Sequence, residues 1–306
     1  MTLRSRIPWL LRWSVSAGLL AWILTRPELA RLGAEWRSLN PAWMLAGLLC
    51  SGCSLALSAW RWQACLQALG LEIPLGRVFR ITMMATVAGC FSFGTLGMDL
   101  AKVLLAGRQL RGRHGGLLSS LVLDHASAVP CVVLMVVMAM LAHGLQPALH
   151  VAQMPVVFGV AATVLLGAAW VSWKFKRLHM EILRVLSDRA TWRGFGIAVF
   201  RSVPMWVMYA GIYYCAARAI GVVVPLAGFA GVIAIADGVA SLPITIAGLG
   251  VREQALQWLL GNGYGVSPAS AVALSLTGFS LSLAGAAVGA ICCGGRSIEP
   301  EERIPS

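Results

Sequence analysis

Seven ionisable side chains of this 306-residue sequence lie inside or directly beside long apolar runs. A charge in such a place is costly unless it is paired or solvated, so each is a candidate functional residue. The cations suit the binding of an anionic group, and the carboxylates with histidine suit proton transfer. The seven residues are Asp99, Lys102, Asp124, His125, Asp237, Arg252 and Glu253.

Two of the charged positions follow glycine-rich turns that repeat along the chain. Leu96-Gly97-Met98-Asp99 and Leu249-Gly250-Val251-Arg252 are offset by 153 residues, half the chain length. We expect the cations near these turns, helped by backbone N–H groups at helix starts, to bind a lipid phosphate. The alternative is that the charged residues form salt bridges between the halves or lie in interfacial water. The predicted phosphate-binding residues are Lys102, Arg252, Gly94, Gly97, Gly248 and Gly250.

Four acidic residues and one histidine are predicted to lie at the interface between the halves or to couple transport to an ion. Asp99 and Lys102 share a helix face, since they are three residues apart, and Glu253 occupies the equivalent second turn. Asp124 and His125 are expected either to form a protonatable site or to pair structurally with Arg111 or Arg113.

Asp237 lies alone among apolar residues, and it has either a substrate or ion role or a structural partner such as Arg201 or Arg218. The sequence shows no catalytic signature, nucleotide loop or metal-ligand spacing, so we expect no enzyme, no cofactor and no metal site. The eight cysteines lie singly or adjacent in apolar runs, which favours buried thiols over a disulfide framework.

The composition requires a membrane to hold these residues. Apolar residues make up 58% of the chain, charged residues only 12%, and the mean hydropathy is +0.79. Ordinary soluble domains carry about 25% charged residues. The net charge of +12 fits basic cytoplasmic flanks better than a nucleic-acid groove, because no stretch is long enough for a soluble domain. We therefore expect a polytopic α-helical membrane protein with no nucleic-acid partner.

Six apolar runs are long enough to cross about 30 Å of hydrocarbon. We read the first as a membrane helix and not as a cleaved signal peptide, because no small-residue cleavage site follows it. Shorter amphipathic pieces at Glu28 to Arg37 and Glu181 to Arg193 are expected to be interfacial helices. The predicted spans are Ile7 to Leu24, Ala42 to Trp60, Gly116 to Leu141, Pro155 to Trp173, Phe195 to Ala217 and Ala269 to Cys292.

Two further apolar stretches, Ile81 to Met98 and Val222 to Gly250, are interrupted by glycine. A full crossing by the first would place the basic cluster after it outside the cell, against the bias of Lys and Arg for the cytoplasm. We therefore predict two re-entrant hairpins. With three spans per half, the halves have opposite orientations, which predicts an inverted 3+3 repeat. The predicted units are residues 1–153, 154–295 and a polar tail at 296–306.

The chain resembles the transmembrane flippase-domain family of lysylphosphatidylglycerol synthase, as a stand-alone member without the soluble synthase domain. One marker is Trp60-Arg61-Trp62-Gln63, followed by the run from Gly94 to Lys102. The other is Gly248-Leu249-Gly250-Val251-Arg252-Glu253, which is close to the family's Gly-Leu-Gly-x-Arg-Glu. Lysine at position 102 replaces the family's arginine.

The resemblance and the residues together predict a flippase or scramblase for an anionic or headgroup-modified lipid such as a phospholipid, glycolipid or polyprenyl phosphate. Two alternatives stay open: a proton- or ion-coupled transporter of a small solute, and a scaffold for a lipid-biosynthetic enzyme. The expected partners are membrane lipids, with such an enzyme and a homo-oligomer as further candidates. We expect a multi-pass protein of the bacterial inner membrane with both termini in the cytoplasm.

Overall fold

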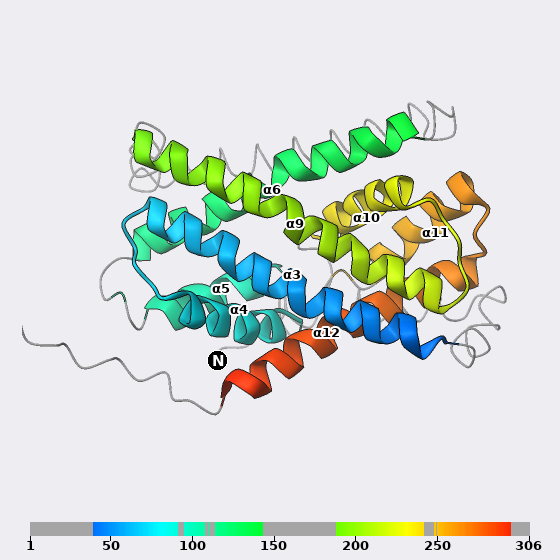
Figure 1. Ribbon diagram of the computed structural model, residues 1–306, viewed down its shortest axis with the longest axis horizontal. Coiled ribbons are helices and arrows are strands. Elements are labelled where there is room, and N and C mark those ends of the chain that lie inside the picture. Colours follow the sequence, from blue (N-terminus) through cyan, green and yellow to red (C-terminus); the bar gives the residue numbers. More distant parts are fainter. Residues whose placement is uncertain are drawn as a thin grey trace, which may run out of the picture.

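The computed structural model describes residues 39–90, 95–107, 110, 114–142, 188–241, 248 and 250–294, and within them every regular element is an α-helix (Figure 1). The all-α prediction is therefore confirmed for this part of the chain. The helices are α3 (Pro41–Ala68), α4 (Leu75–Cys90), α5 (Thr95–Gly107), α6 (His114–Ala142), α9 (Arg189–Ala219), α10 (Leu226–Ala240), α11 (Val251–Tyr264) and α12 (Pro268–Gly294).

Among the described residues, four helices are long and apolar enough to cross a membrane: Pro41–Ala68, Gly115–Leu141, Thr191–Ala219 and Pro268–Cys292. They match four of the six predicted spans, and the spans predicted at 7–24 and 155–173 lie outside the described residues. The chain is thus a multi-pass membrane protein.

Two helices extend beyond the predicted boundaries near these spans. Helix α3 continues past the predicted span end at Trp60 for two further turns to Ala68. The interfacial helix predicted up to Arg193 is wrong at its end, because residues 189–193 form the first turn of the long helix α9. The interfacial helix predicted at 28–37 lies outside the described residues.

Helices α3 and α9 pack antiparallel along their whole length (Figure 1). At one end the backbone N–H of Asn40, whose side chain caps the start of α3, donates to the carbonyl oxygen of Ala219 at 2.9 Å. At the other end Gly194 is so close to Ala68 that a Cβ on the glycine would lie 2.3 Å from the alanine Cβ. Small residues permit this approach, as is typical of helix pairs in membranes.

The short helices form two helical hairpins that start from opposite ends of the α3–α9 pair. Val78 at the start of α4 and Ala106 at the end of α5 belong to one core cluster with the C-terminal half of α3. Phe229 at the start of α10 and Leu260 at the end of α11 belong to the other, with the C-terminal part of α9. Each hairpin therefore returns to the end from which it came.

The tips of the two hairpins meet. The hydroxyl of Thr95, the first residue of α5, donates to the carbonyl oxygen of Ser241 at the end of α10 at 3.5 Å. The four short helices have 13 to 16 residues, or about 20 to 24 Å at 1.5 Å per residue, which is less than the hydrocarbon thickness. The order long, short, short, long occurs twice: 28, 16, 13 and 29 residues, then 31, 15, 14 and 27.

Helix α12 fits against three other helices through its glycines. A Cβ on Gly278 would lie 2.4 Å from the ring of Tyr213 on α9, and one on Gly285 would lie 2.2 Å from the hydroxyl of Ser51 on α3. A Cβ on Gly289 would meet Met83 of α4 at 2.6 Å. These contacts hold α12 between the long-helix pair and the first hairpin.

Candidate functional site

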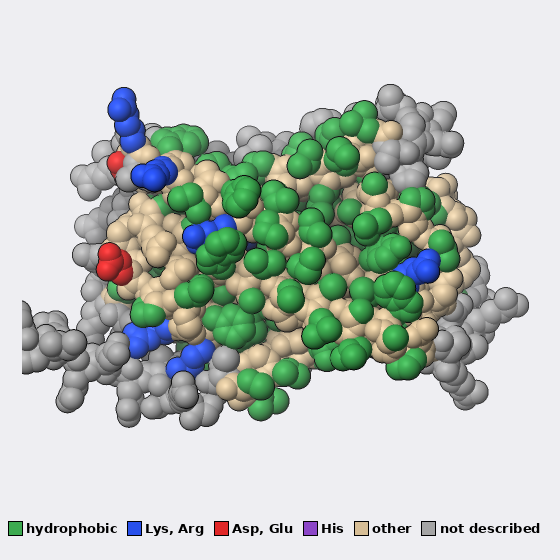
Figure 2. All heavy atoms as spheres, in the orientation of Figure 1, with side chains coloured by type: hydrophobic (Ala, Val, Ile, Leu, Met, Phe, Trp, Pro, Cys, Tyr) green, Lys and Arg blue, Asp and Glu red, His purple; other side chains and the backbone are tan. Residues whose placement is uncertain are grey.

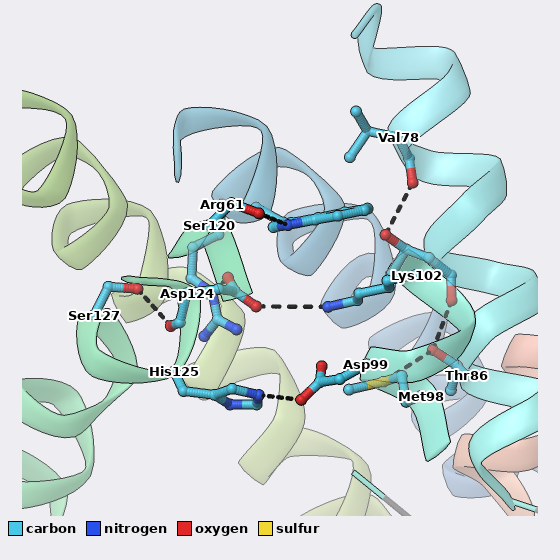
Figure 3. Close-up of polar contacts among 12 residues, drawn as sticks. Arg61, Val78, Thr86, Met98, Asp99, Lys102, Ser120, Asp124, His125 and Ser127 are labelled. Atoms are coloured by element: carbon cyan, nitrogen blue, oxygen red, sulfur yellow. Dashed lines mark hydrogen bonds and ion pairs between the residues drawn. The ribbon is translucent and has the colours of Figure 1, made fainter. Parts of the chain in front are cut away.

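The first group of charged residues is a buried triad that joins α3, α5 and α6 (Figure 3). Arg61 donates through Nε to Oδ1 of Asp124 at 2.7 Å, and Nζ of Lys102 lies 3.5 Å from Oδ2 of the same carboxylate. The side chains of Lys102 and Asp124 are each only 1% exposed. Two cations thus share one carboxylate, which leaves the triad with a formal charge of +1.

Aromatic and hydroxyl groups complete the surroundings of this triad. Nζ of Lys102 lies 4.9 Å from the ring centroid of Trp62, a cation–π contact. The indole N–H of Trp62 donates in turn to the hydroxyl of Ser120 at 3.1 Å. Nη1 of Arg61 is buried and has no hydrogen-bond partner among the described residues. A phosphate would reach Lys102 in this conformation only by displacing Asp124.

Asp124 pairs with Arg61 and Lys102. Arg111 and Arg113, the partners expected for it, lie outside the described residues. Asp124 and His125 are neighbours on α6, but their side chains contact different partners. The two residues therefore do not form one protonatable pair.

His125 pairs instead with Asp99 of α5, and its Nε2 lies 2.7 Å from Oδ2 of that carboxylate (Figure 3). This pair is far more accessible than the triad, because the side chains are 46% and 17% exposed. Asp99 and Lys102, three residues apart, thus both face α6 but contact different residues on it. An outside group can therefore approach the Asp99–His125 pair without breaking a buried contact, whereas it cannot approach the triad in this way.

Asp237 and Arg252 form an ion pair between the two helices of the second hairpin, α10 and α11. Nη2 of Arg252 donates to Oδ1 of Asp237 at 3.1 Å, and the hydroxyl of Tyr209 donates to the same oxygen at 2.7 Å. The pair is only partly buried, with Asp237 26% exposed. Nε of Arg252 has no hydrogen-bond partner among the described residues. The partner expected for Asp237, Arg201 or Arg218, was therefore wrong.

Two aromatic rings hold the guanidinium of Arg252. Its Cζ lies 5.9 Å from the ring centroid of Tyr213 and 5.8 Å from that of Phe279. These faces restrict the side chain, whose hydrogen-bonding edge points toward Asp237. A guanidinium binds a carboxylate or a phosphate in a fork geometry.

Glu253 has a structural task in the turn before α11. Its Oε2 accepts the backbone N–H of Gly250 at 2.5 Å, and its Oε1 accepts the hydroxyl of Ser275 on α12 at 2.8 Å. The carboxylate, which is fully buried, caps the helix start and fixes it to α12. The N–H of Gly250 is therefore occupied and does not face a free anion site.

The other glycines of the predicted site differ in role. Gly248 and Gly250 have φ angles of 72° and 87°, which glycine adopts without strain. A Cβ on Gly248 would lie 2.9 Å from the carbonyl oxygen of Ala240, so the turn sits directly on the end of α10. Gly97 is buried in the first turn of α5, and Gly94 lies outside the described residues.

Sequence reasoning missed three contributors to these clusters. Arg61 directly follows the span predicted to end at Trp60, so it does not stand out as a charge inside an apolar run, although its Trp-Arg-Trp-Gln motif is a usable signal. Tyr209 and Ser275 are uncharged residues within apolar runs, so nothing in the sequence distinguishes them from ordinary helix-packing residues. The described part of the chain thus contains a buried triad, two partly exposed ion pairs and one helix-capping carboxylate.

The comparison with protein families agrees with the resemblance carried by the two motifs. The model of the lysylphosphatidylglycerol synthase TM region matches residues 9–289, which is nearly the whole chain. A search of curated proteins finds no match. Because this match covers nearly the whole chain and agrees with the helical bundle and its charged hairpins, the chain belongs to the family of the lysylphosphatidylglycerol synthase TM region.

Proposed function

We propose that the protein is a lipid flippase or scramblase that moves an anionic or headgroup-modified lipid across the bacterial inner membrane. The observation that carries this proposal is the contact between the two hairpin tips, with a partly exposed ion pair in each half near that contact. A charged headgroup cannot cross hydrocarbon alone, because desolvating its charge costs too much free energy. Polar groups that approach from both ends supply a path for it.

The partly exposed pairs suit headgroup contact better than the buried triad does. At Asp237 and Arg252, a lipid phosphate replaces the carboxylate as the partner of the guanidinium, and Tyr209 keeps Asp237 hydrogen-bonded during the exchange. Lys102, by contrast, is held by Asp124 and buried on every side. The proposal therefore assigns the phosphate to Arg252 first.

The arrangement of helices supports an inverted repeat with two re-entrant hairpins. Two four-helix series of similar lengths have their first long helices antiparallel, and their hairpins start from opposite ends of that pair. An antiparallel relation between equivalent helices is what opposite orientation of the halves produces. On this proposal both termini are cytoplasmic, and the end at which α9 begins, with Arg189 and Arg193 exposed, faces the cytoplasm.

A proton-coupled transporter of a small solute is the second candidate, and the Asp99–His125 pair favours it. Histidine changes charge near neutral pH, and this one is paired with a carboxylate at 2.7 Å at an accessible position. A measurement of lipid scrambling in the absence of an ion gradient distinguishes the two functions, because a proton-coupled transporter requires the gradient and a passive scramblase does not.

Reconstitution tests the proposal. Proteoliposomes with fluorescent phosphatidylglycerol or polyprenyl-phosphate analogues in the inner leaflet report movement as accessibility to an external quencher. We expect the double variant Asp237→Asn, Arg252→Gln to slow this movement at least about tenfold, since it removes both charges while Tyr209 keeps an acceptor. Arg193→Gln, which removes an exposed cation at the start of α9, serves as the matched control and should transport normally.

Two outcomes contradict the proposal. Folded wild-type protein that moves no lipid of an anionic panel favours the scaffold or the solute transporter. Equal rates in wild-type and double-variant protein show that the charged hairpin pair takes no part in the path.

A further inference from the structure

Two arginines on α9 stack on two tryptophans of α3, and neither pair belongs to the charged clusters described above. Cζ of Arg201 lies 4.1 Å from the ring centroid of Trp60, and Nη1 of the same arginine donates to the carbonyl oxygen of Trp60 at 2.8 Å. Cζ of Arg218 lies 5.4 Å from the ring centroid of Trp43. Because α3 and α9 are antiparallel, the two pairs occupy opposite ends of the same seam.

The spacing of the two pairs matches the thickness of a membrane. Trp43 and Trp60 are 17 residues apart, and so are Arg201 and Arg218. At 1.5 Å per residue this separates the pairs by about 26 Å along the helices, close to the roughly 30 Å of bilayer hydrocarbon. Tryptophan and arginine are the side chains expected at the two hydrocarbon boundaries.

The surface between the pairs is apolar. Leu45 and Leu49 of α3 and Val203 and Val207 of α9 are exposed there. Figure 2 shows hydrophobic side chains over the face formed by α3 and α9, with basic side chains near its two ends. This face is therefore suited to contact with lipid chains, with cations at the level of the headgroups.

The guanidinium groups keep free hydrogen-bonding capacity. Both arginines are partly exposed, and in the described part of the chain no carboxylate lies within 4.0 Å of either. A guanidinium has five N–H donors, and the carbonyl of Trp60 takes one of those on Arg201. At a hydrocarbon boundary the abundant anion that such donors meet is a lipid phosphate.

We propose that Arg201 with Trp60 and Arg218 with Trp43 are two binding sites for the phosphate of an anionic phospholipid, one in each leaflet. The indole ring orients each guanidinium so that its outer edge faces the headgroup layer. These sites require only that α3 and α9 span the membrane, so they are independent of the proposed transport.

The two sites also set the depth of the charged hairpin pair. Tyr209, which donates to Asp237, is eight residues from Arg201 and nine from Arg218 along α9. The Asp237–Arg252 pair therefore lies close to mid-depth between the two boundary sites, where a group on a path between leaflets is needed.

Native mass spectrometry of protein released from nanodiscs of equal phosphatidylcholine and phosphatidylglycerol tests the sites. We expect the wild-type protein to retain phosphatidylglycerol in preference to phosphatidylcholine. Arg201→Gln and Arg218→Gln should each weaken the apparent affinity for one phosphatidylglycerol about tenfold, and the double variant should lose two. Arg193→Gln should retain the wild-type number, and added inorganic phosphate should displace none.

Unchanged retention in both glutamine variants overturns the proposal. An equal loss in Arg193→Gln overturns it as well, because it shows diffuse surface charge, and displacement by inorganic phosphate shows an anion site without lipid specificity. Where a glutamine variant fails to fold, the lysine variant at the same position keeps the charge and should retain more phosphatidylglycerol than phosphatidylcholine. Equal retention of both lipids by wild-type protein refutes both sites regardless of the variants.

Discussion

Removing the carboxylate of Asp124 should destabilise the protein far more than removing the ammonium of Lys102. In the variant Asp124→Asn, Arg61 and Lys102 remain buried at 6% and 1% exposure with no anion between them. Removing one partner of a buried ion pair costs about 3 to 5 kcal/mol. In Lys102→Met the pair of Arg61 and Asp124 survives at 2.7 Å and becomes neutral overall, so we expect a change within about 1 kcal/mol.

The double variant Lys102→Met, Asp124→Asn tests whether unpaired buried cations cause the loss of stability. It leaves one unpaired buried cation where Asp124→Asn leaves two, so it should be less destabilised than the single asparagine variant, and the two effects should not add. Unfolding in mixed micelles of a mild detergent with SDS, followed by tryptophan fluorescence, gives the free energies of unfolding. The reasoning is refuted if Lys102→Met destabilises as much as Asp124→Asn, or if the double variant is the least stable of the three.

The transport assay with the same variants tests whether Lys102 binds a lipid phosphate. If Lys102 binds a lipid phosphate, Lys102→Met should abolish transport although its stability is preserved. If the lysine only balances the triad, transport should persist, and the phosphate-binding role falls to Arg252 alone.

Three further outcomes follow from particular contacts. Glu253→Gln should keep both hydrogen bonds of the helix cap and cost little, whereas Glu253→Ala leaves a buried backbone N–H unpaired and should cost about 1 to 3 kcal/mol of unfolding free energy, measured in the same micelles. Gly285→Leu should destabilise by about 1 to 3 kcal/mol because its side chain meets α3, while Gly196→Leu, which points into open space, should not; equal stability of the two would contradict the helix packing. In a background without native cysteines, a thiol-reactive label should reach Glu72→Cys and Asn262→Cys, which follow α3 and end α11, from opposite sides of the membrane, and labelling from one side would rule out the two-ended hairpin arrangement.

The sequence by itself determined the class of the protein, the described spans and the identity of most charged site residues. These depend on local quantities, because the length and hydropathy of a run decide whether it can cross hydrocarbon, and a charge in such a run stands out without any knowledge of its neighbours. The motif around Gly250 also identified the family that the family model confirms. The span predicted to end at Trp60 is shorter than α3 because Arg61 follows it in the sequence, although the Arg61 guanidinium pairs with Asp124 within the bundle.

Only the tertiary structure decided which charges meet. Asp124 could be recognised as costly, but its pairing with Arg61 and Lys102 depends on how three helices pack. The same holds for Asp237, whose partner is Arg252 of its own hairpin and not an arginine of α9. An ion pair needs two atoms within about 4 Å, and a sequence pattern limits the face of a helix on which a charge lies without fixing the helix that faces it.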